Sequence, residues 1–218
     1  MKISDAENEL FLEWKKVREE FVEDGVADED AYLASPKKIL FVMKEANSPG
    51  GGDWDLRETL RDGGREATFN NLTRWVEGIL SLPDDKPWEK MEVIDEGRRK
   101  DALQKIAIVN LKKSPGGHTT NPLELDAVAR EDRSFLERQF KIYDPDIIIC
   151  CGTQPGDRFH ELKPYSDSTW VSTKRGVLYF EHKPKHFVIL HAHPEARCAD
   201  NFLYYSLIDA VQEILYQK

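Results

Sequence analysis

The sequence predicts an α/β protein, a three-layer α/β/α sandwich built on a central, mostly parallel four-stranded sheet. Three observations predict this fold. Four short apolar runs are spread along the chain, stretches with helical periodicity separate them, and a content of 40% hydrophobic and 33% charged residues is that of a globular protein. Strands that alternate with helices form a mostly parallel sheet with helices packed on its faces.

The chain of 218 residues is short enough for one α/β unit, so we expect a single domain over residues 1–218. Its first part, residues 1–35, is predicted to be a helical extension packed on that domain. Within it, residues 9–22 carry apolar side chains at spacings of three and four, which is typical of an amphipathic helix. These side chains are Leu10, Phe11, Trp14, Val17 and Phe21.

The predicted strands are four continuous apolar runs, residues 38–43, 106–109, 147–151 and 187–190. Each run leads into polar sequence, and continuous apolar runs of this length are typical of strands buried on both faces. The helical patterns cover residues 69–80, 127–143 and 200–215. A weaker pair of runs around Lys174-Arg175-Gly176 predicts a hairpin insertion over residues 165–185.

The formal net charge is −9, which argues against a protein that coats nucleic acid non-specifically, because such binding depends on lysine and arginine.

No apolar run approaches the roughly 18 residues that cross a bilayer, so we expect no membrane association. The opening MKISDAENEL lacks the apolar region of a secretory signal, which favours a cytoplasmic protein. The three cysteines are too few for a disulfide framework or a four-cysteine cluster.

Unusual polar residues follow the predicted strands, at the edge of the sheet where ligands bind in folds of this kind. Glu45 follows the first strand, where a carboxylate could orient a water or stabilise a developing positive charge, although a lone loop glutamate is more often simply solvated. Asn110 ends the second strand. Its amide suits the Watson–Crick edge of a base, although alone it would more often be a turn former or helix cap.

The fourth strand ends in His191-Ala192-His193-Pro194. A histidine here could donate a hydrogen bond to a leaving group, or the two histidines could hold a metal. The metal site lacks further ligands, because Cys198 and the remaining histidines show no ligand spacing. Residues 112–117, KKSPGG, offer charge and backbone N–H groups for phosphate without the spacing of a P-loop.

Taken in order, these segments resemble the uracil-DNA glycosylase superfamily, over about residues 36–216. FVMKEA (41–46) is similar to the V-G-E-A-P-G motif of one branch, and IVNLKKSP (108–115) is similar to its N-V-V-K-C-R-P-P. FLERQ followed by PDIIICCG (135–152) resembles F-L-x-x-Q and P-x-V-I-V-x-L-G, and VILHAHP (188–194) resembles a segment that ends in H-P-S or H-P-A. Residues 38–75 also look like an uncharacterised prokaryotic branch.

The resemblance implies a glycosylase fold and hydrolysis of the N-glycosidic bond of uracil or another damaged base in DNA. Such cleavage builds positive charge on the sugar and negative charge on the base, so a carboxylate and a donor are needed. The resemblance gives these catalytic roles to Glu45 and His193. The base would be bound by Asn110, Phe69, Ala46 and Asn47, with Phe69 stacking on it. Phe69 fits a place in the hydrophobic core equally well.

The resemblance further implies nucleic-acid contacts by Lys112, Lys113, Ser114 and Arg197, with Arg197 entering the duplex.

The sequence departs from the family pattern at three positions. Lys44 and Asn47 replace a glycine and a proline of the first motif, and Glu195 stands where the family places a small residue near a phosphate. The related branch holds an iron–sulfur cluster with four cysteines. With three cysteines here, we expect no cofactor and no metal.

Two alternatives to a DNA glycosylase remain open. One is a non-catalytic protein that binds a base, a nucleotide or a nucleic-acid end in the same pocket. The other is a hydrolase or transferase of a small nucleoside-like substrate. A positive stripe from Lys112 and Lys113 to Arg197 would favour nucleic acid, and a negative rim would favour a small ligand.

Overall fold

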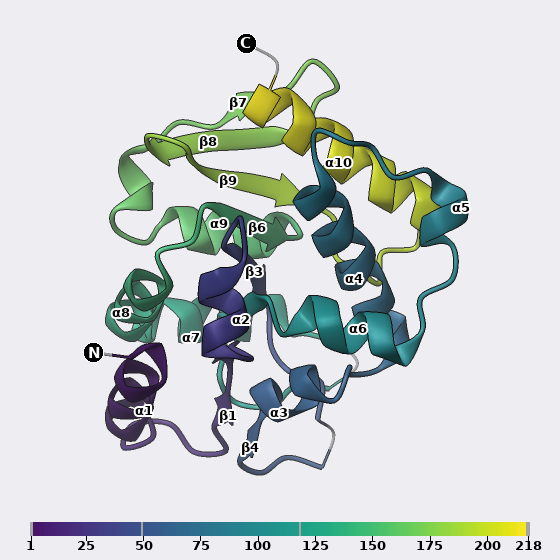
Figure 1. Ribbon diagram of the computed structural model, residues 1–218. Helices are drawn as coiled ribbons and strands as arrows, with labels where there is room; N and C mark the ends of the chain where they lie inside the picture. The colour runs from purple at the N-terminus through teal and green to yellow at the C-terminus, as the bar shows by residue number, and fades with distance from the viewer. Residues whose placement is uncertain (1, 49, 118, 217–218) are drawn as a thin grey trace.

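The computed structural model of the protein describes residues 2–48, 50–117 and 119–216. Within them lies a seven-stranded mixed sheet, shown in Figure 1. In spatial order its strands are β2 (Gly25–Val26), β5 (Ile106–Asn110), β3 (Ile39–Met43), β6 (Ile147–Cys151), β9 (His186–His191), β8 (Leu178–Lys183) and β7 (Val171–Ser172). The central four, β5, β3, β6 and β9, are parallel. They are the four apolar runs of the sequence, so the parallel core of the sheet is confirmed.

The sheet is larger than the four strands predicted. Strands β2, β8 and β7 extend it at both sides in antiparallel orientation. The segment over residues 165–185 therefore continues the main sheet through β8. Phe180 in the middle of β8 is buried while its neighbours are partly or largely exposed, as expected of an antiparallel strand with one covered face.

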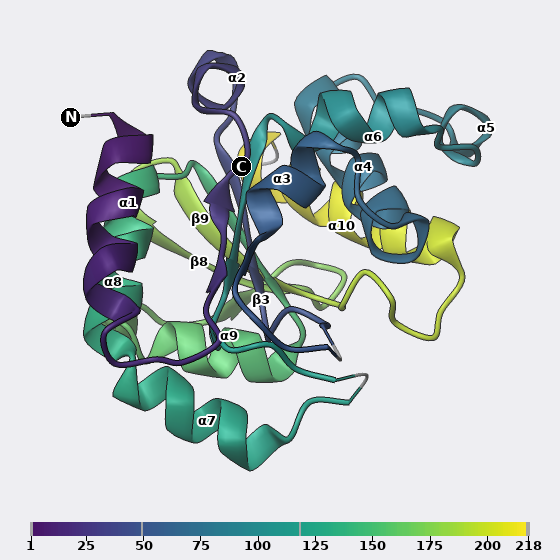
Figure 2. The same cartoon turned by 90° about the horizontal axis from the view of Figure 1, so that it is seen from below.

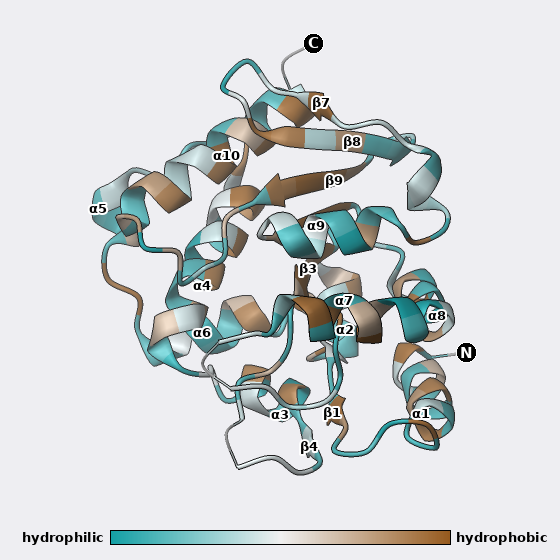
Figure 3. Ribbon diagram, turned by 180° about the vertical axis from the view of Figure 1, so that it is seen from behind, coloured by the Kyte–Doolittle hydropathy of each residue, from teal (hydrophilic) through white to brown (hydrophobic). Residues whose placement is uncertain are grey.

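Helices cover both faces of the sheet, as Figure 2 shows. One face carries α1 (Ile3–Trp14), α7 (Pro122–Glu131), α8 (Arg133–Tyr143) and α9 (Thr153–His160). The other carries α3 (Leu56–Arg61), α4 (Glu66–Ser81), α6 (Glu96–Leu103) and α10 (Asp200–Tyr216). Successive strand residues alternate between two buried apolar clusters, Phe41 in one and Leu40 in the other. Figure 3 shows the resulting hydrophobic colour of β3 and β9.

Short elements complete the fold. β1 (Val22–Glu23) pairs in parallel with β4 (Trp54–Asp55), so the glycine-rich segment that follows β3 is anchored beside the N-terminal region. The remaining short helices are α2 (Glu29–Ala34), α5 (Trp88–Met91) and a 3₁₀ turn, η1 (Tyr165–Asp167). In the described part of the chain, no helix is long and apolar enough to cross a membrane.

Two predicted helices differ in the structure. The helix expected over residues 9–22 begins earlier, at Ile3, and ends at Trp14; Val17 is 60% exposed and Glu20 has a left-handed φ of 51°. The helix expected over residues 127–143 is two helices that meet at Asp132. That side chain is buried and accepts hydrogen bonds from the Nε of Arg18 at 2.9 Å, so a long-range ion pair fixes the break.

The strand order places a crevice at the carboxyl edge of the sheet. Strand β3 lies between β5, which follows it in the chain, and β6, which comes later. The connections that leave β3 and β6 therefore run in opposite directions. In open α/β sheets the loops separate at such a point and leave room for a ligand.

Candidate functional site

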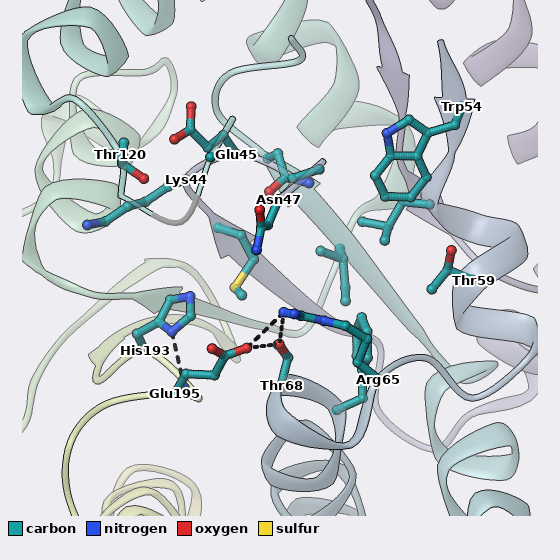
Figure 4. A pocket seen from close by; sticks show the side chains of 17 residues that line it. Lys44, Glu45, Asn47, Trp54, Thr59, Arg65, Thr68, Thr120, His193 and Glu195 are labelled. Carbon is teal, nitrogen blue, oxygen red and sulfur yellow. Dashed lines mark hydrogen bonds and ion pairs between the residues drawn. The ribbon is translucent and has the colours of Figure 1, made fainter. Parts of the chain in front are cut away.

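A pocket of about 250 Å³ lies at the carboxyl ends of β3, β5 and β9. Four segments line it: the end of β3 and its loop, the segment from β4 to the start of α4, the end of β5 with the loop after it, and the loop after β9. Its lining residues, drawn in Figure 4, are Met43, Lys44, Glu45, Ala46, Asn47, Trp54, Leu56, Thr59, Arg65, Thr68, Phe69, Ile108, Asn110, Gly117, Thr120, His193 and Glu195.

The residues that the sequence singled out for catalysis and base binding all line this pocket. They are Glu45, Ala46, Asn47, Phe69, Asn110 and His193. Phe69 is 7% exposed and also belongs to the hydrophobic core between the sheet and α4, so the two alternatives for this ring are compatible. In Figure 4 the Asn47 side chain reaches toward the middle of the pocket, whereas Lys44 points to one side.

Glu45 is held in place by a lysine and a glycine. Its side chain is 5% exposed, and its Oε2 accepts a hydrogen bond from the Nζ of Lys112 at 2.8 Å. Lys112 also pairs with Glu124 at 2.7 Å. Burial works against the charge on Lys112, but its bonds to Glu124 and Glu45 outweigh this and raise the pKa of Lys112. Gly116 packs so closely that an added Cβ would lie 2.2 Å from the Cδ of Glu45.

His193 has a defined tautomer. Its Nδ1 lies 3.1 Å from the backbone N–H of Glu195 and accepts from it, so the neutral ring carries its proton on Nε2. Burial lowers the pKa of His193; the Glu195 carboxylate opposes this and Lys44 adds to it. At neutral pH the ring is therefore an uncharged donor. Figure 4 shows it across the pocket from Trp54.

Asn110 is anchored from behind by a buried aspartate. The backbone N–H and the Nδ2 of Asn110 both donate to Oδ2 of Asp24, at 2.7 and 3.2 Å. The other oxygen of Asp24 accepts from the Nζ of Lys113 at 2.6 Å and from the Nε2 of Gln139 at 2.8 Å. Asp24 and Lys113 are both fully buried. The carboxylate has four donors and no contact with solvent.

Glu195 is paired rather than free. Its Oε1 accepts from the NH2 of Arg65 at 3.1 Å and from the hydroxyl of Thr68. Figure 4 shows these bonds joining the loop after β9 to the start of α4 along one wall of the pocket. The guanidinium offsets the negative charge that would repel a phosphate, so Glu195 is a weaker obstacle to nucleic acid than its sequence position suggests.

The side chains expected to contact nucleic acid do not form one continuous exposed surface. Lys112 is 7% exposed and lies between two glutamates, and Lys113 is 0% exposed against Asp24. Ser114 is half-buried, and Arg197 is exposed in the loop after β9. Burial lowers the pKa of Lys113, an effect that Asp24 opposes. A positive stripe from Lys112 and Lys113 to Arg197 is therefore not formed.

The two histidines at the end of β9, His191 within the strand and His193 just after it, do not act together. The ring of His191 packs against Trp75 with centroids 5.0 Å apart, and its Nε2 lies 3.2 Å from the carbonyl oxygen of Leu203. Burial lowers the pKa of His191 to about 4. His191 thus joins β9 to α10, whereas His193 faces the pocket. Among the described residues, no group of three or more His, Cys, Asp or Glu side chains is arranged to hold a metal.

The cysteines do not fit an iron–sulfur cluster. Cys150 and Cys151 are buried on opposite faces of β6, in different core clusters, and Cys198 is exposed in the loop after β9. Burial raises the pKa of the Cys150 thiol well above its usual value, which disfavours the thiolate that ligates iron. Three thiols so arranged cannot supply the four ligands of such a cluster.

Sequence reasoning missed several lining residues. Trp54, Thr59 and Arg65 come from the segment after the glycine-rich loop, and Thr68 comes from α4. A tryptophan two residues after the glycine-rich stretch is a usable signal, since large aromatic side chains often line binding sites. The pairing of Arg65 and Thr68 with Glu195, about 130 residues away, has no signal in the sequence.

The chain matches no model of a known protein family, and a search of curated proteins finds no significant match. The fold and the geometry of the pocket are therefore the grounds for proposing a function.

Proposed function

We propose that the protein has the fold of the uracil-DNA glycosylase superfamily and hydrolyses the N-glycosidic bond of uracil or another damaged base. One observation carries the proposal: Glu45, Phe69, Asn110 and His193 come from four separate segments and line a single pocket. The pocket volume of about 250 Å³ is near the lower limit for small-molecule sites, which suits one heterocyclic base.

The pocket offers a carboxylate for the sugar and donors for the base. Hydrolysis breaks the bond from the sugar C1′ to the base nitrogen, and the bonding electrons leave with the base. Glu45 would stabilise the positive charge on the sugar, and the Nε2–H of His193 would donate to an oxygen of the departing base. A water oxygen then bonds to C1′, and the proton it releases ends on the base.

A substrate smaller than nucleic acid is the second candidate, because of how Lys112 and Lys113 are buried. Binding to a nucleic-acid backbone depends on exposed lysine and arginine, and these two side chains are engaged by Glu45, Glu124 and Asp24. The same pocket would then act on a free nucleoside, with the same roles for Glu45 and His193.

Base release from both substrate classes tests the proposal. The protein is incubated with single- and double-stranded oligonucleotides that contain uracil, hypoxanthine or xanthine, and with the corresponding free nucleosides. Abasic sites are detected by alkaline cleavage and free bases by chromatography. Glu45→Gln and His193→Ala are each expected to lower the rate by about 100-fold or more, in line with the loss of one charged or donor group in a catalytic site.

Glu124→Gln is the matched control, because Glu124 also pairs with Lys112 but does not line the pocket. This variant is expected to retain activity. Release of no base by the wild-type protein above the level of a Glu45→Gln, His193→Ala double variant, for every substrate, would remove the enzymatic proposal. Retained binding in that case would favour a protein that recognises a base without cleaving it.

A further inference from the structure

Asn110 presents its amide to the pocket in one orientation. An asparagine side chain is nearly symmetric in shape, but one end accepts hydrogen bonds and the other donates them. Asp24 decides which end is which, because an ionised carboxylate oxygen can only accept. The Nδ2 of Asn110 must therefore face Asp24, at 3.2 Å. The amide oxygen and the second N–H remain for a ligand.

Asp24 itself cannot turn or retreat. Its Oδ2 also accepts from the backbone N–H of Asn110 at 2.7 Å, so it is fixed to the strand. Its Oδ1 is held by Lys113 at 2.6 Å and by Gln139 at 2.8 Å. Asp24, Lys113 and Gln139 are all fully buried, and no water-exposed position is open to the carboxylate. A cluster of buried polar groups thus holds the amide of Asn110 in one orientation.

An amide fixed in this way discriminates between bases of similar shape. Along the Watson–Crick edge, uracil and hypoxanthine place an oxo group beside a ring N–H, whereas cytosine and adenine place an amino group beside a bare ring nitrogen. The two orders of donor and acceptor are opposite. A freely turning asparagine can match either order, but a fixed one leaves two groups unpaired against the wrong base.

We propose that Asp24, held by Lys113 and Gln139, is a specificity-determining positioning residue that makes the pocket select oxo bases over amino bases. The inference rests on the proposed function for the position of the base in the pocket. Asp24 does not touch the ligand. It acts through Asn110, and it explains why a fully buried Asp–Lys pair lies directly behind the site.

The test compares the binding of two nucleoside analogues, 2′-deoxy-2′-fluorouridine and 2′-deoxy-2′-fluorocytidine, both free and within a single-stranded oligonucleotide. The fluorine destabilises positive charge on the sugar, so the glycosidic bond resists cleavage and binding is read independently of activity. The ratio of the two dissociation constants is measured by calorimetry for the wild-type protein and for Asp24→Asn. The wild-type protein is expected to prefer the uracil analogue by about tenfold or more.

Asp24→Asn keeps the shape of the side chain but changes one oxygen into an NH2 group. Lys113 and Gln139 both donate, so they favour the remaining oxygen on their side and place the NH2 group against Asn110, where it opposes the backbone N–H as well as the Nδ2 of that residue. The lost bond to the backbone N–H lowers stability, whereas the side chain of Asn110 can turn. The amide oxygen of Asn110 then faces that NH2, and the order of donor and acceptor in the pocket is reversed. The preference for the uracil analogue is expected to fall at least about tenfold, to equality or beyond.

Two further variants separate specificity from stability. Tyr143→Phe removes a buried hydroxyl bonded to Gln139 at 3.0 Å, at the far side of the same cluster, and should leave the ratio unchanged. Asp24→Asn combined with Lys113→Met removes the buried charge left without a partner, should the single variant fold poorly. Circular dichroism confirms folding of each protein.

The outcomes distinguish the inference from the proposed function. A reduced ratio in Asp24→Asn, with the ratio of Tyr143→Phe intact, supports the inference. An unchanged ratio in a folded Asp24 variant, or an equal fall in affinity for both analogues, overturns it while base release by the wild-type protein stands. Failure of the wild-type protein to bind either analogue in either form counts against the proposed function and removes the inference with it.

Discussion

The position of the Glu45 side chain depends on a glycine at position 116, which packs against it. The carboxylate fills the space where Gly116 would carry a Cβ, and the backbone N–H of Gly116 donates to the carbonyl oxygen of Ala46 at 2.8 Å. The loops after β3 and β5 are thus joined so closely that only glycine fits between them. The position of the candidate catalytic carboxylate is set by this contact and by Lys112.

Gly116→Ala is therefore expected to lower base release about tenfold or more, less than Glu45→Gln, because the new methyl group displaces the carboxylate without removing it. Gly50→Ala is the control, since a Cβ at Gly50 would meet nothing within 4 Å. Base release and thermal unfolding are measured for both variants. Full activity in Gly116→Ala would show that the placement of Glu45 by this contact is unimportant for the reaction.

For single residues, the sequence reveals positions that directly end a strand. Glu45, Asn110 and His193 could be placed together because the carboxyl ends of parallel strands share one edge. The same reasoning could not separate His193 from His191, since a difference of two residues leaves the packing of each ring undetermined. It also could not find Asp24, because nothing local distinguishes a buried aspartate with four donors from a solvated one.

Helix α4 supplies Thr68 and Phe69 to the pocket, and its position depends on close packing against α10. At Gly78 an added Cβ would lie 2.6 Å from the Cδ1 of Ile208 and 2.8 Å from the Cε2 of Tyr204. The Tyr204 ring is fully buried and its hydroxyl donates to the carbonyl oxygen of Lys86 at 3.0 Å, so it cannot move aside freely.

Gly78→Ala is expected to destabilise the protein by about 1–2 kcal/mol, because overpacking outweighs the better helix propensity of alanine. Gly97→Ala in the first turn of α6 should have the opposite sign and stabilise by about 0.5–1 kcal/mol, since Gly97 is exposed and its nearest neighbour, the Oδ1 of the capping residue Asp95 at 3.3 Å, needs to shift by only a few tenths of an ångström. Urea unfolding measures both. Equal stabilisation by the two alanines would contradict the close contact of α4 with α10.

Among the helices and strands, long apolar patterns predict their elements well, whereas short strand pairings cannot be read from the sequence. The core strands are continuous apolar runs, and α4 and α10 begin and end close to their expected limits. Strand β2 has two residues and β7 has two, so their pairing is decided by neighbours and not by their own sequence. The break at Asp132 depends on Arg18, which lies 114 residues away.

The stability of the whole molecule should fall in mild acid because one buried and one half-buried histidine must remain neutral. Burial lowers the pKa of His191 and of His182 to about 4, while the value in the unfolded chain is 6.5. Between these values the unfolded chain binds protons that the folded protein does not. Stability is therefore intact above pH 6.5 and is lost as the pH falls toward 4, by up to about 3 kcal/mol for His191 alone.

Urea unfolding of the wild-type protein and of His191→Gln, from pH 7 to pH 4, measures this effect. The variant loses the contacts of the ring with Trp75 and Leu203, so it is less stable at pH 7. Its stability should nevertheless decline less steeply with acid, because one of the two histidines is gone. Parallel pH profiles for the two proteins would assign the decline to other groups.

The carboxylate of Asp24 has one more consequence, for association between molecules. The outer side of β5 is paired with β2 over only two residues, and beyond them the N–H of Asn110 is taken by Asp24. At the other edge, β7 is equally short, and the part of β8 outside it has a bulge between Glu181 and Lys183. An unpaired strand edge is where another chain adds to a sheet, and charges, bulges and short strands prevent such addition. The group that fixes the pocket amide thus also occupies a backbone N–H at this edge of β5, in a position that is itself buried.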